Sequence, residues 1–201
     1  MIVQVPISNT LSFARGNQIH SNSVAIVTDS YSIPTADALI TTIPNLLVSV
    51  LTADCTPILL LDTKQNIVAA IHAGWKGTLA HVVTNTLQIL FNTFGTKPNH
   101  IYAYIGACIS AKSYEVGEDV FSHFNEKFLL PAYPNAPILN SKRLLDLKAA
   151  NYAQLVESCI PPTNIEVSPY CTYQQHTDFF SYRYENGKTG RMISFIGIAH
   201  V

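Results

Sequence analysis

The sequence predicts a single α/β domain built on mixed β-sheets. Its 201 residues are close to one domain of roughly 150 residues. Hydrophobic residues make up 48% of the chain and charged residues 12%, a balance that favours a large apolar core and excludes an intrinsically disordered chain. Apolar runs of strand length mix with two stretches of helical periodicity, without the regular βαβ order of a doubly wound sheet.

Short apolar runs bounded by polar turns predict the strands. These runs lie at residues 24–27, 46–51, 58–61, 67–71, 101–105 and 191–199. A polar turn at residues 62–66 joins the third run to the fourth and predicts a hairpin. Because both arms of this hairpin are almost wholly apolar, we expect its sheet to be covered on both faces.

Helical periodicity begins after the Gly-Trp-Lys-Gly sequence at residues 74–77, whose two glycines predict a tight strand-to-helix turn. Apolar residues then recur at steps of three and four, namely Leu79, Val82, Val83, Leu87, Leu90 and Phe94. Gly95 is a typical stop for this helix. A second helix is predicted over residues 146–158, with Asp146 as its N-cap, and the proline-rich residues 128–140 are predicted to be a surface excursion.

Composition excludes several classes of partner. Twelve Lys and Arg against 13 Asp and Glu give a net charge of −1, so no global field draws the chain to nucleic acid or to an anionic membrane. No apolar run approaches the roughly 20 residues of a membrane span. The N-terminus lacks the features of a signal peptide, and the four cysteines form no C-x-x-C pair. We therefore expect a cytoplasmic protein without a disulfide framework.

A thiol and an imidazole are predicted to meet at one rim of the hairpin. Cys55 lies in the polar stretch 52–57, directly before the first arm, and His72 lies at the end of the second arm. Since paired arms bring their outer ends together, these side chains would be close in space. A buried apolar cysteine and a histidine satisfied in the core are the alternatives.

His20, ahead of the first strand, is the third candidate. Two histidines and one cysteine are a credible catalytic zinc set, which leaves a fourth position for water or substrate. The same donors could hold copper, but blue copper also uses an axial methionine, and Met1 and Met192 are both far from Cys55 in the sequence. A thiol hydrolase, with Cys55 as nucleophile and His72 as base, is a further alternative.

A series of short motifs identifies a family resemblance. The motifs are Gln-Ile-His at 18–20, Ala-Asp-Ala-Leu at 36–39, Thr-Ala-Asp-Cys-Thr-Pro at 52–57, Ile-His-Ala-Gly-Trp-Lys-Gly at 71–77, Ile-Gly at 105–106, Tyr-Glu-Val-Gly at 114–117, Leu-Asp-Leu at 145–147, Cys-Thr at 171–172, Phe-Phe-Ser-Tyr-Arg at 179–183 and Thr-Gly-Arg-Met at 189–192. In this order they resemble the laccase-like multicopper polyphenol oxidase family, now described as purine nucleoside phosphorylases and peptidoglycan-editing factors.

The resemblance implies a four-layer α/β/β/α fold with mixed β-sheets, similar to that of the cytotoxic necrotizing factors. It implies one domain over residues 1–201, shortened at its N-terminus, because family members have several dozen more residues before the motif at 18–20. It also implies that His20, Cys55 and His72 bind one zinc ion.

The implied activity is phosphorolysis of adenosine, inosine, guanosine and methylthioadenosine, with adenosine deamination as a second activity. The partners would be a purine nucleoside and phosphate, and the chain would be a monomer or a homodimer. Three alternatives stay open: a peptidoglycan-precursor editing hydrolase, a copper polyphenol oxidase, and a catalytically impaired zinc-binding relative.

The matching motifs also suggest roles for residues beside the ligands. Asp54 and Cys55 are predicted to be catalytic, with Asp54 moving a proton; a turn-capping role is the alternative for Asp54. Arg183 and Arg191 are predicted to hold phosphate through bidentate contacts, with a structural ion pair as the alternative. Tyr182 is predicted to stack on the purine, with core packing as the alternative.

Overall fold

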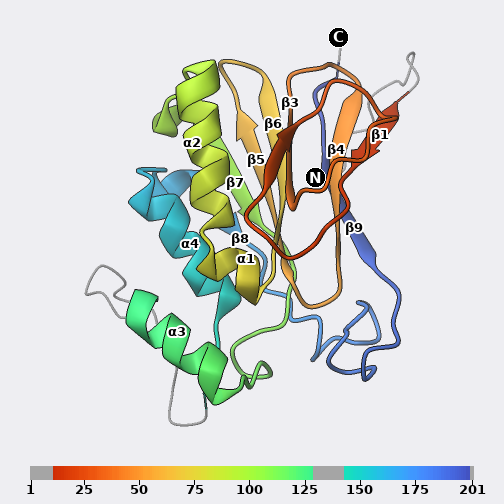
Figure 1. Cartoon of the computed structure of the whole chain (residues 1–201), viewed down its shortest axis with the longest axis vertical. Helices are drawn as coiled ribbons and strands as arrows, with labels where there is room; N and C mark the ends of the chain where they lie inside the picture. Colours follow the sequence, from red (N-terminus) through yellow and green to blue (C-terminus); the bar gives the residue numbers. More distant parts are fainter. Residues whose placement is uncertain (1–10, 129–142, 200–201) are drawn as a thin grey trace.

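The computed structural model describes residues 11–128 and 143–199. Helices cover one face of a six-stranded sheet, and a three-stranded sheet covers the other face (Figure 1). Both sheets are mixed, which confirms the predicted fold class. All but the first residue of the predicted surface excursion at 128–140 lies outside the described residues.

The six-stranded sheet has the order β2-β3-β6-β5-β7-β8. Its strands in chain order are β2 (Val24–Ile26), β3 (Ala38–Thr41), β5 (Thr56–Asp62), β6 (Ile67–Ala73), β7 (Ile101–Ile105) and β8 (Ile165–Val167). β2 and β3 are parallel, as are β7 and β8, and the other neighbours are antiparallel. The sheet therefore contains four of the strands predicted from apolar runs, together with β3 and β8, which no run predicted.

The second sheet has the order β1-β4-β9. It consists of β1 (Ser12–Arg15), β4 (Leu46–Thr52) and β9 (Met192–Ile196). β1 runs parallel to β4, and β9 runs antiparallel to it. The predicted runs at 46–51 and 191–199 are confirmed as strands, and β1 is an addition.

β5 and β6 form the predicted hairpin. Their register pairs Thr56 with Ala73 at one end and Asp62 with Ile67 at the turn. All seven residues of β6 are buried. One apolar cluster fills the space between this sheet and the helices, and a second lies between the two sheets. The near-continuous apolar character of the hairpin thus reflects a sheet covered on both faces, as expected.

The helices differ from the prediction at one point. They are α1 (Trp75–Leu79), α2 (Val82–Phe94), α3 (Glu118–Phe128) and α4 (Leu147–Glu157), with short 3-10 helices at Pro98–His100 and Pro162–Asn164. A single helix continuing from Leu79 is wrong, because His81 adopts a left-handed conformation (φ 61°) that separates α1 from α2. Gly95 ends α2 in a left-handed conformation, and Asp146 caps α4 by accepting a hydrogen bond from the backbone N–H of Ala149, both as predicted.

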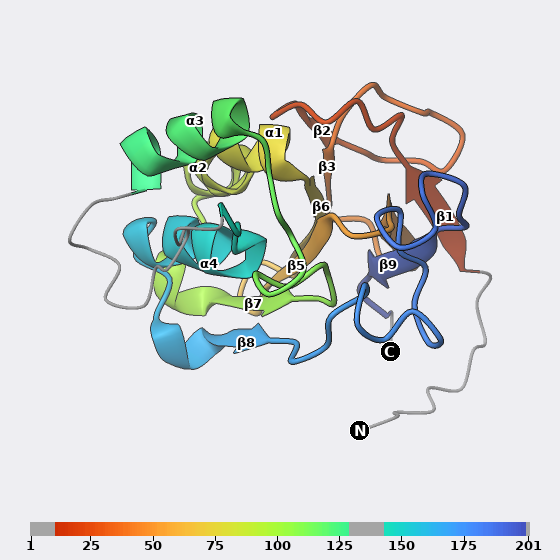
Figure 2. The ribbon, with the colours of Figure 1, turned by 90° about the horizontal axis from the view of Figure 1, so that it is seen from below.

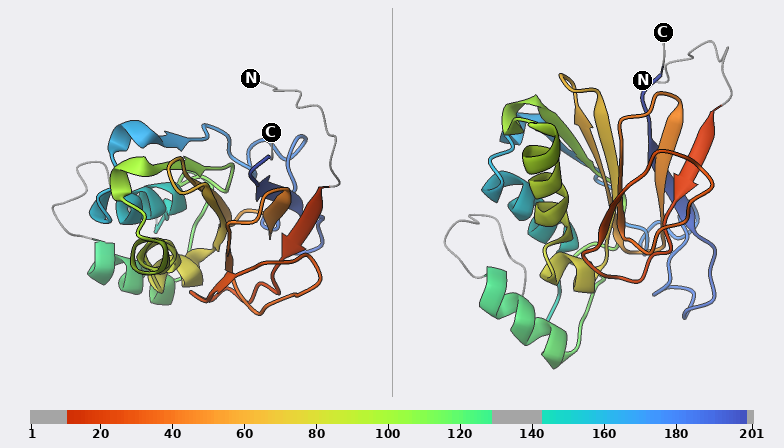
Figure 3. Two further views of the ribbon diagram at one scale, coloured as in Figure 1. Left: turned by 90° about the horizontal axis from the view of Figure 1, so that it is seen from above. Right: turned by 45° about the horizontal axis from the view of Figure 1, so that its top comes forward.

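The layers are visible from below in Figure 2 and from two further directions in Figure 3. Within the described residues, the six-stranded sheet lies between the layer of helices and the three-stranded sheet. These are three of the four layers that the resemblance implies. No helix in the described part of the chain has the length and apolar character needed to cross a membrane.

Candidate metal centre

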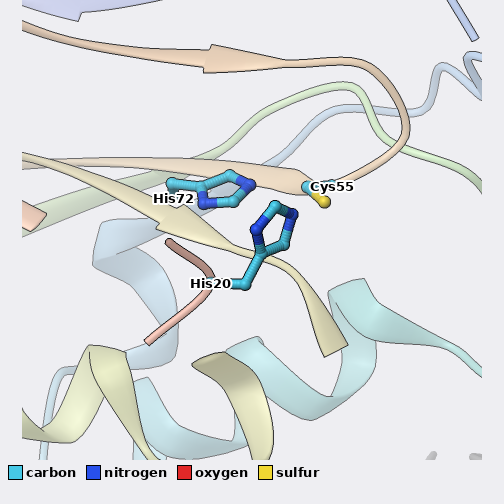
Figure 4. Close-up of side chains that lie close together, drawn as sticks. All are labelled: His20, Cys55 and His72. Carbon is cyan, nitrogen blue, oxygen red and sulfur yellow. The ribbon is translucent and has the colours of Figure 1, made fainter. Parts of the chain in front are cut away.

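Three side chains from separate segments converge at one end of the hairpin. His20 lies in the loop before β2, Cys55 lies directly before β5, and His72 is the second-last residue of β6. One ligand atom from each residue lies within 4.8 Å of the others. Figure 4 shows the two imidazole rings and the thiol gathered around a common point. The structure therefore brings together the three residues that the sequence singled out.

The hairpin register explains how Cys55 and His72 meet. Pro57 is paired with His72 across the two strands, so the chain entering β5 passes beside the end of β6. Side chains alternate along β6: Ile71 faces the helices, and Ala70 faces the three-stranded sheet. His72 consequently points away from the helical layer, and it is only 3% exposed.

Asp37, directly before β3, orients the His72 ring. Its Oδ1 lies 2.8 Å from Nδ1 of His72, and the Asp37 side chain is fully buried. A histidine held at Nδ1 by a carboxylate presents Nε2 as its ligand atom, an arrangement common around bound zinc. The sequence motif contained Asp37, but no role for it was predicted, although a lone carboxylate entering an apolar strand was a usable signal.

The ionisation of these groups is coupled. Burial alone would raise the pKa of the Cys55 thiol, but hydrogen bonds with His20 and His72 outweigh it and lower the pKa to about 7. Burial would lower the pKa of His72, yet hydrogen bonds with Asp37 and Cys55 raise it to about 9. For Asp37, burial is outweighed by hydrogen bonds from His72 and Ser21, which lower the pKa to about 2. The centre therefore favours a thiolate, the form that binds metals.

Two of the eight non-glycine residues with positive φ in the described part of the chain belong to the centre. His20 has φ 60° and Asp54 has φ 83°, so a ligand and the neighbour of another ligand both adopt the left-handed region. Residues other than glycine occupy this region at a cost of roughly 1–3 kcal/mol, and histidine and aspartate enter it more readily than most. The contacts around His20 and Asp54 therefore hold the backbone of the centre in a costly conformation.

Gly74 forms one wall of the centre with its bare backbone. It is the single residue between β6 and α1, which confirms the predicted tight turn, but its φ of −73° is open to any residue. A Cβ at this position would lie 3.0 Å from Sγ of Cys55 and 3.1 Å from Cδ2 of His20. Glycine is therefore favoured here by space and not by backbone conformation, since a side chain would press on two ligands.

We expect Gly74→Ala to weaken metal binding while the fold persists. The added methyl group would push Cys55 and His20 apart, and disturbed ligand orientation typically costs about 10–100-fold in metal affinity. Zinc titration against a competing chelator measures the change. Lys76→Ala, an exposed position in the same turn, is the control and should keep wild-type affinity. Wild-type affinity in Gly74→Ala would contradict the account.

Asp54 ties a distant segment to the centre. Its Oδ1 accepts a hydrogen bond of 2.6 Å from the Thr172 hydroxyl, and its Oδ2 accepts one of 2.7 Å from the backbone N–H of Arg183. The carboxylate is 8% exposed. Asp54 therefore fixes the segment that carries Tyr182 and Arg183 beside Cys55.

The two predicted phosphate ligands hold backbone oxygens. Arg183 donates to the carbonyl of Glu115 and lies over the ring of Tyr114. Arg191 donates to the carbonyls of residues 189 and 190 and lies over the ring of Tyr182, which is 54% exposed. Neither arginine forms an ion pair among the described residues, so the structural ion pairs considered as alternatives are not seen there.

Both sequence and fold match known proteins. A family model described as multi-copper polyphenol oxidoreductase laccase matches residues 3–199. The chain is 36% identical over 192 residues to a purine nucleoside phosphorylase of Bacteroides thetaiotaomicron, covering 90% of this chain and 71% of that protein. It is 33% identical over 196 residues to adenosine deaminase RL5 from an unknown prokaryotic organism, covering 90% of this chain and 72% of that protein.

The crystal structure of YlmD from Geobacillus stearothermophilus has the same fold. The TM-score is 0.86 at 30% identity, covering 94% of this chain and 74% of that one. The resemblance inferred from the motifs is confirmed by these matches, since the family model spans nearly the whole chain. The chain belongs to the multi-copper polyphenol oxidoreductase laccase family.

Proposed function

We propose that the chain is a zinc-dependent enzyme that acts on purine nucleosides, by phosphorolysis and, with adenosine, by deamination. The observation that carries the proposal is the convergence of His20, Cys55 and His72, with ligand atoms within 4.8 Å of one another. Relatives named purine nucleoside phosphorylase and adenosine deaminase support the substrate class. Adenosine, inosine, guanosine and methylthioadenosine, with phosphate, are the substrates to test.

The donor set fits zinc better than copper. Two imidazoles and a thiolate are zinc donors, and a catalytic zinc site keeps one position open. A blue-copper site would add a weak axial methionine, and the three converging residues include none. When bound, zinc would lower the pKa of a coordinated water to about 7 and so supply a nucleophile at neutral pH.

The neighbouring residues would bind and orient the substrate. Asp54 fixes the segment carrying Tyr182 and Arg183 beside Cys55, which supports a purine stacked on Tyr182 and a phosphate held by Arg183 and Arg191. Each oxygen of Asp54 accepts one hydrogen bond, which leaves a lone pair on each oxygen that could take a proton. The role of Asp54 in proton transfer stays part of the proposal, beside its anchoring contacts.

A chelator experiment tests the proposed function. We expect one zinc ion per purified chain and phosphate-dependent release of the purine base from a nucleoside. Removal of zinc should abolish this release and added zinc should restore it, because the proposal makes the zinc-bound form of the centre the active form. An activated water would be needed for the deamination alone, since phosphate is the nucleophile in phosphorolysis. Deamination of adenosine should need zinc but not phosphate. A protein that carries no zinc and takes none up would refute the proposal.

A thiol hydrolase is the second candidate, and one observation favours it. The Cys55 thiol contacts the His72 ring, and that ring contacts the buried carboxylate of Asp37. Cysteine hydrolases arrange their nucleophile, base and orienting group in the same way. The same experiment separates the candidates. Thiol catalysis would persist or increase when zinc is removed, and alkylation of Cys55 with iodoacetamide would stop it.

A further inference from the structure

We propose that Asp37 is the positioning residue of the metal centre, because its carboxylate sets the geometry of both histidine ligands. The inference rests on the proposed function, since it assumes that His20 and His72 bind a metal. It goes further by naming a residue that touches neither metal nor substrate. The argument has two parts, one for each histidine.

His72 is attached to Asp37 twice. Its backbone N–H donates a hydrogen bond of 2.7 Å to the Asp37 carbonyl, at the place where β6 runs beside the start of β3. Its ring Nδ1 lies 2.8 Å from Oδ1 of Asp37. The backbone contact fixes where the side chain begins and the ring contact fixes its rotation. Nε2 is then the nitrogen turned toward Cys55 and His20.

His20 is held by the same carboxylate through its backbone. The N–H groups of Ile19, His20 and Ser21 donate to the two Asp37 oxygens at 3.3, 2.9 and 2.7 Å, and the Ser21 hydroxyl donates at 2.7 Å. His20 is otherwise an exposed loop residue in the left-handed region, with φ 60°. Three successive amides converging on one carboxylate stabilise this unfavourable conformation and aim the ring at Cys55.

Only a carboxylate satisfies this set of donors. Asp37 accepts from the ring of His72 and from four groups of the 19–21 loop, and it has no donor of its own. An asparagine at this position would offer one oxygen and would turn its amide hydrogens toward another donor. One histidine would therefore lose its support in Asp37→Asn, although the side-chain volume is almost unchanged.

Asp37→Asn and Asp29→Asn form a matched pair for the test. Asp29 accepts hydrogen bonds from the N–H groups of Tyr31 and Ser32 and from the Ser32 hydroxyl. Like Asp37, it therefore holds a loop through backbone amides and a serine hydroxyl, but none of these donors belongs to a histidine. We expect zinc affinity, measured by competition with a chromophoric chelator, to fall about 10–100-fold in Asp37→Asn and to stay at the wild-type value in Asp29→Asn. The absorption of the cobalt-loaded protein should change in the first variant only.

The outcomes are distinguishable. Equal zinc affinity in wild type and Asp37→Asn would overturn this inference and leave the proposed function standing. A wild-type chain that takes up no zinc would refute the proposed function, and the inference with it. An equal loss of affinity in Asp29→Asn would show a general effect of loop stability and would also overturn the inference.

A measurement on the wild-type protein covers the case in which Asp37→Asn does not fold. Nitrogen-15 NMR of the histidine rings reports which nitrogen carries hydrogen and which binds zinc. We expect His72 to keep its Nδ1 hydrogen and to show the zinc-induced shift at Nε2. A zinc-induced shift at Nδ1 of His72 would mean that Asp37 does not set the ligand atom, and the inference would fail.

Discussion

Cys55→Ala is expected to weaken zinc binding strongly and to reduce nucleoside turnover with it. Cys55 supplies the only sulfur donor of the centre. Structural zinc sites are worth roughly 10–16 kcal/mol, so the loss of one of three ligands would cost about 3–5 kcal/mol, which is on the order of 10²–10⁴-fold in affinity. Chelator competition measures the affinity, and the phosphate-dependent release of purine base measures the turnover.

Cys159→Ala is the matched control for this substitution. Cys159 is a free and exposed cysteine that follows α4, away from the three ligands. We expect this variant to retain wild-type zinc affinity and turnover. If Cys55→Ala also retained wild-type affinity, the thiol would not be a ligand, and the metal centre would have to be assigned to other donors.

Leu87→Ala should cause a large loss of stability. Leu87 lies in α2 and is fully buried in the cluster between this helix and the six-stranded sheet. Truncation of a buried leucine typically costs about 2–5 kcal/mol of unfolding free energy, because it removes apolar contacts and leaves a cavity. In a chain of this size we expect the melting temperature to fall by roughly 5–15 °C.

The neighbouring residue provides the control. Gln88 follows Leu87 in α2 but is exposed to solvent, so Gln88→Ala should change the unfolding free energy by less than about 0.5 kcal/mol. Denaturant unfolding of the metal-free proteins gives both values without a contribution from zinc. A small effect of Leu87→Ala would mean that α2 does not pack on the sheet as described.

Much of the fold could be predicted because its strands are apolar on both faces. The hairpin of β5 and β6 gave two clear runs separated by a polar turn, and its register follows from that turn. β1, β3 and β8 were missed because none of them contains more than three consecutive apolar residues, whereas β2 belongs to the four-residue apolar run at 24–27. α3 was missed because it is largely polar; Val120 and Phe124 are buried among the side chains that the structure describes in it.

The site was predictable to the extent that strand pairing determines it. Cys55 and His72 lie at the outer ends of a recognisable hairpin, so their proximity follows from the local sequence. His20 reaches the centre from the loop before β2, so no strand pairing predicts its position. The sequence offered it only as a third candidate, and its role as a zinc ligand came from the family resemblance. The role of Asp37 depends on three loop amides converging on one carboxylate, a conformation that no spacing in the sequence encodes.

The β5–β6 hairpin places the metal centre at one end and the exposed turn that joins the two strands at the other. Five paired positions lie between His72 and the turn, so the centre and the turn are about 17 Å apart along the strands. The turn residues 63–66 are all exposed. Exposed loop tips accept insertions readily. A reporter tag or fluorophore grafted into this turn would therefore label the protein without disturbing the coordination chemistry at the opposite end.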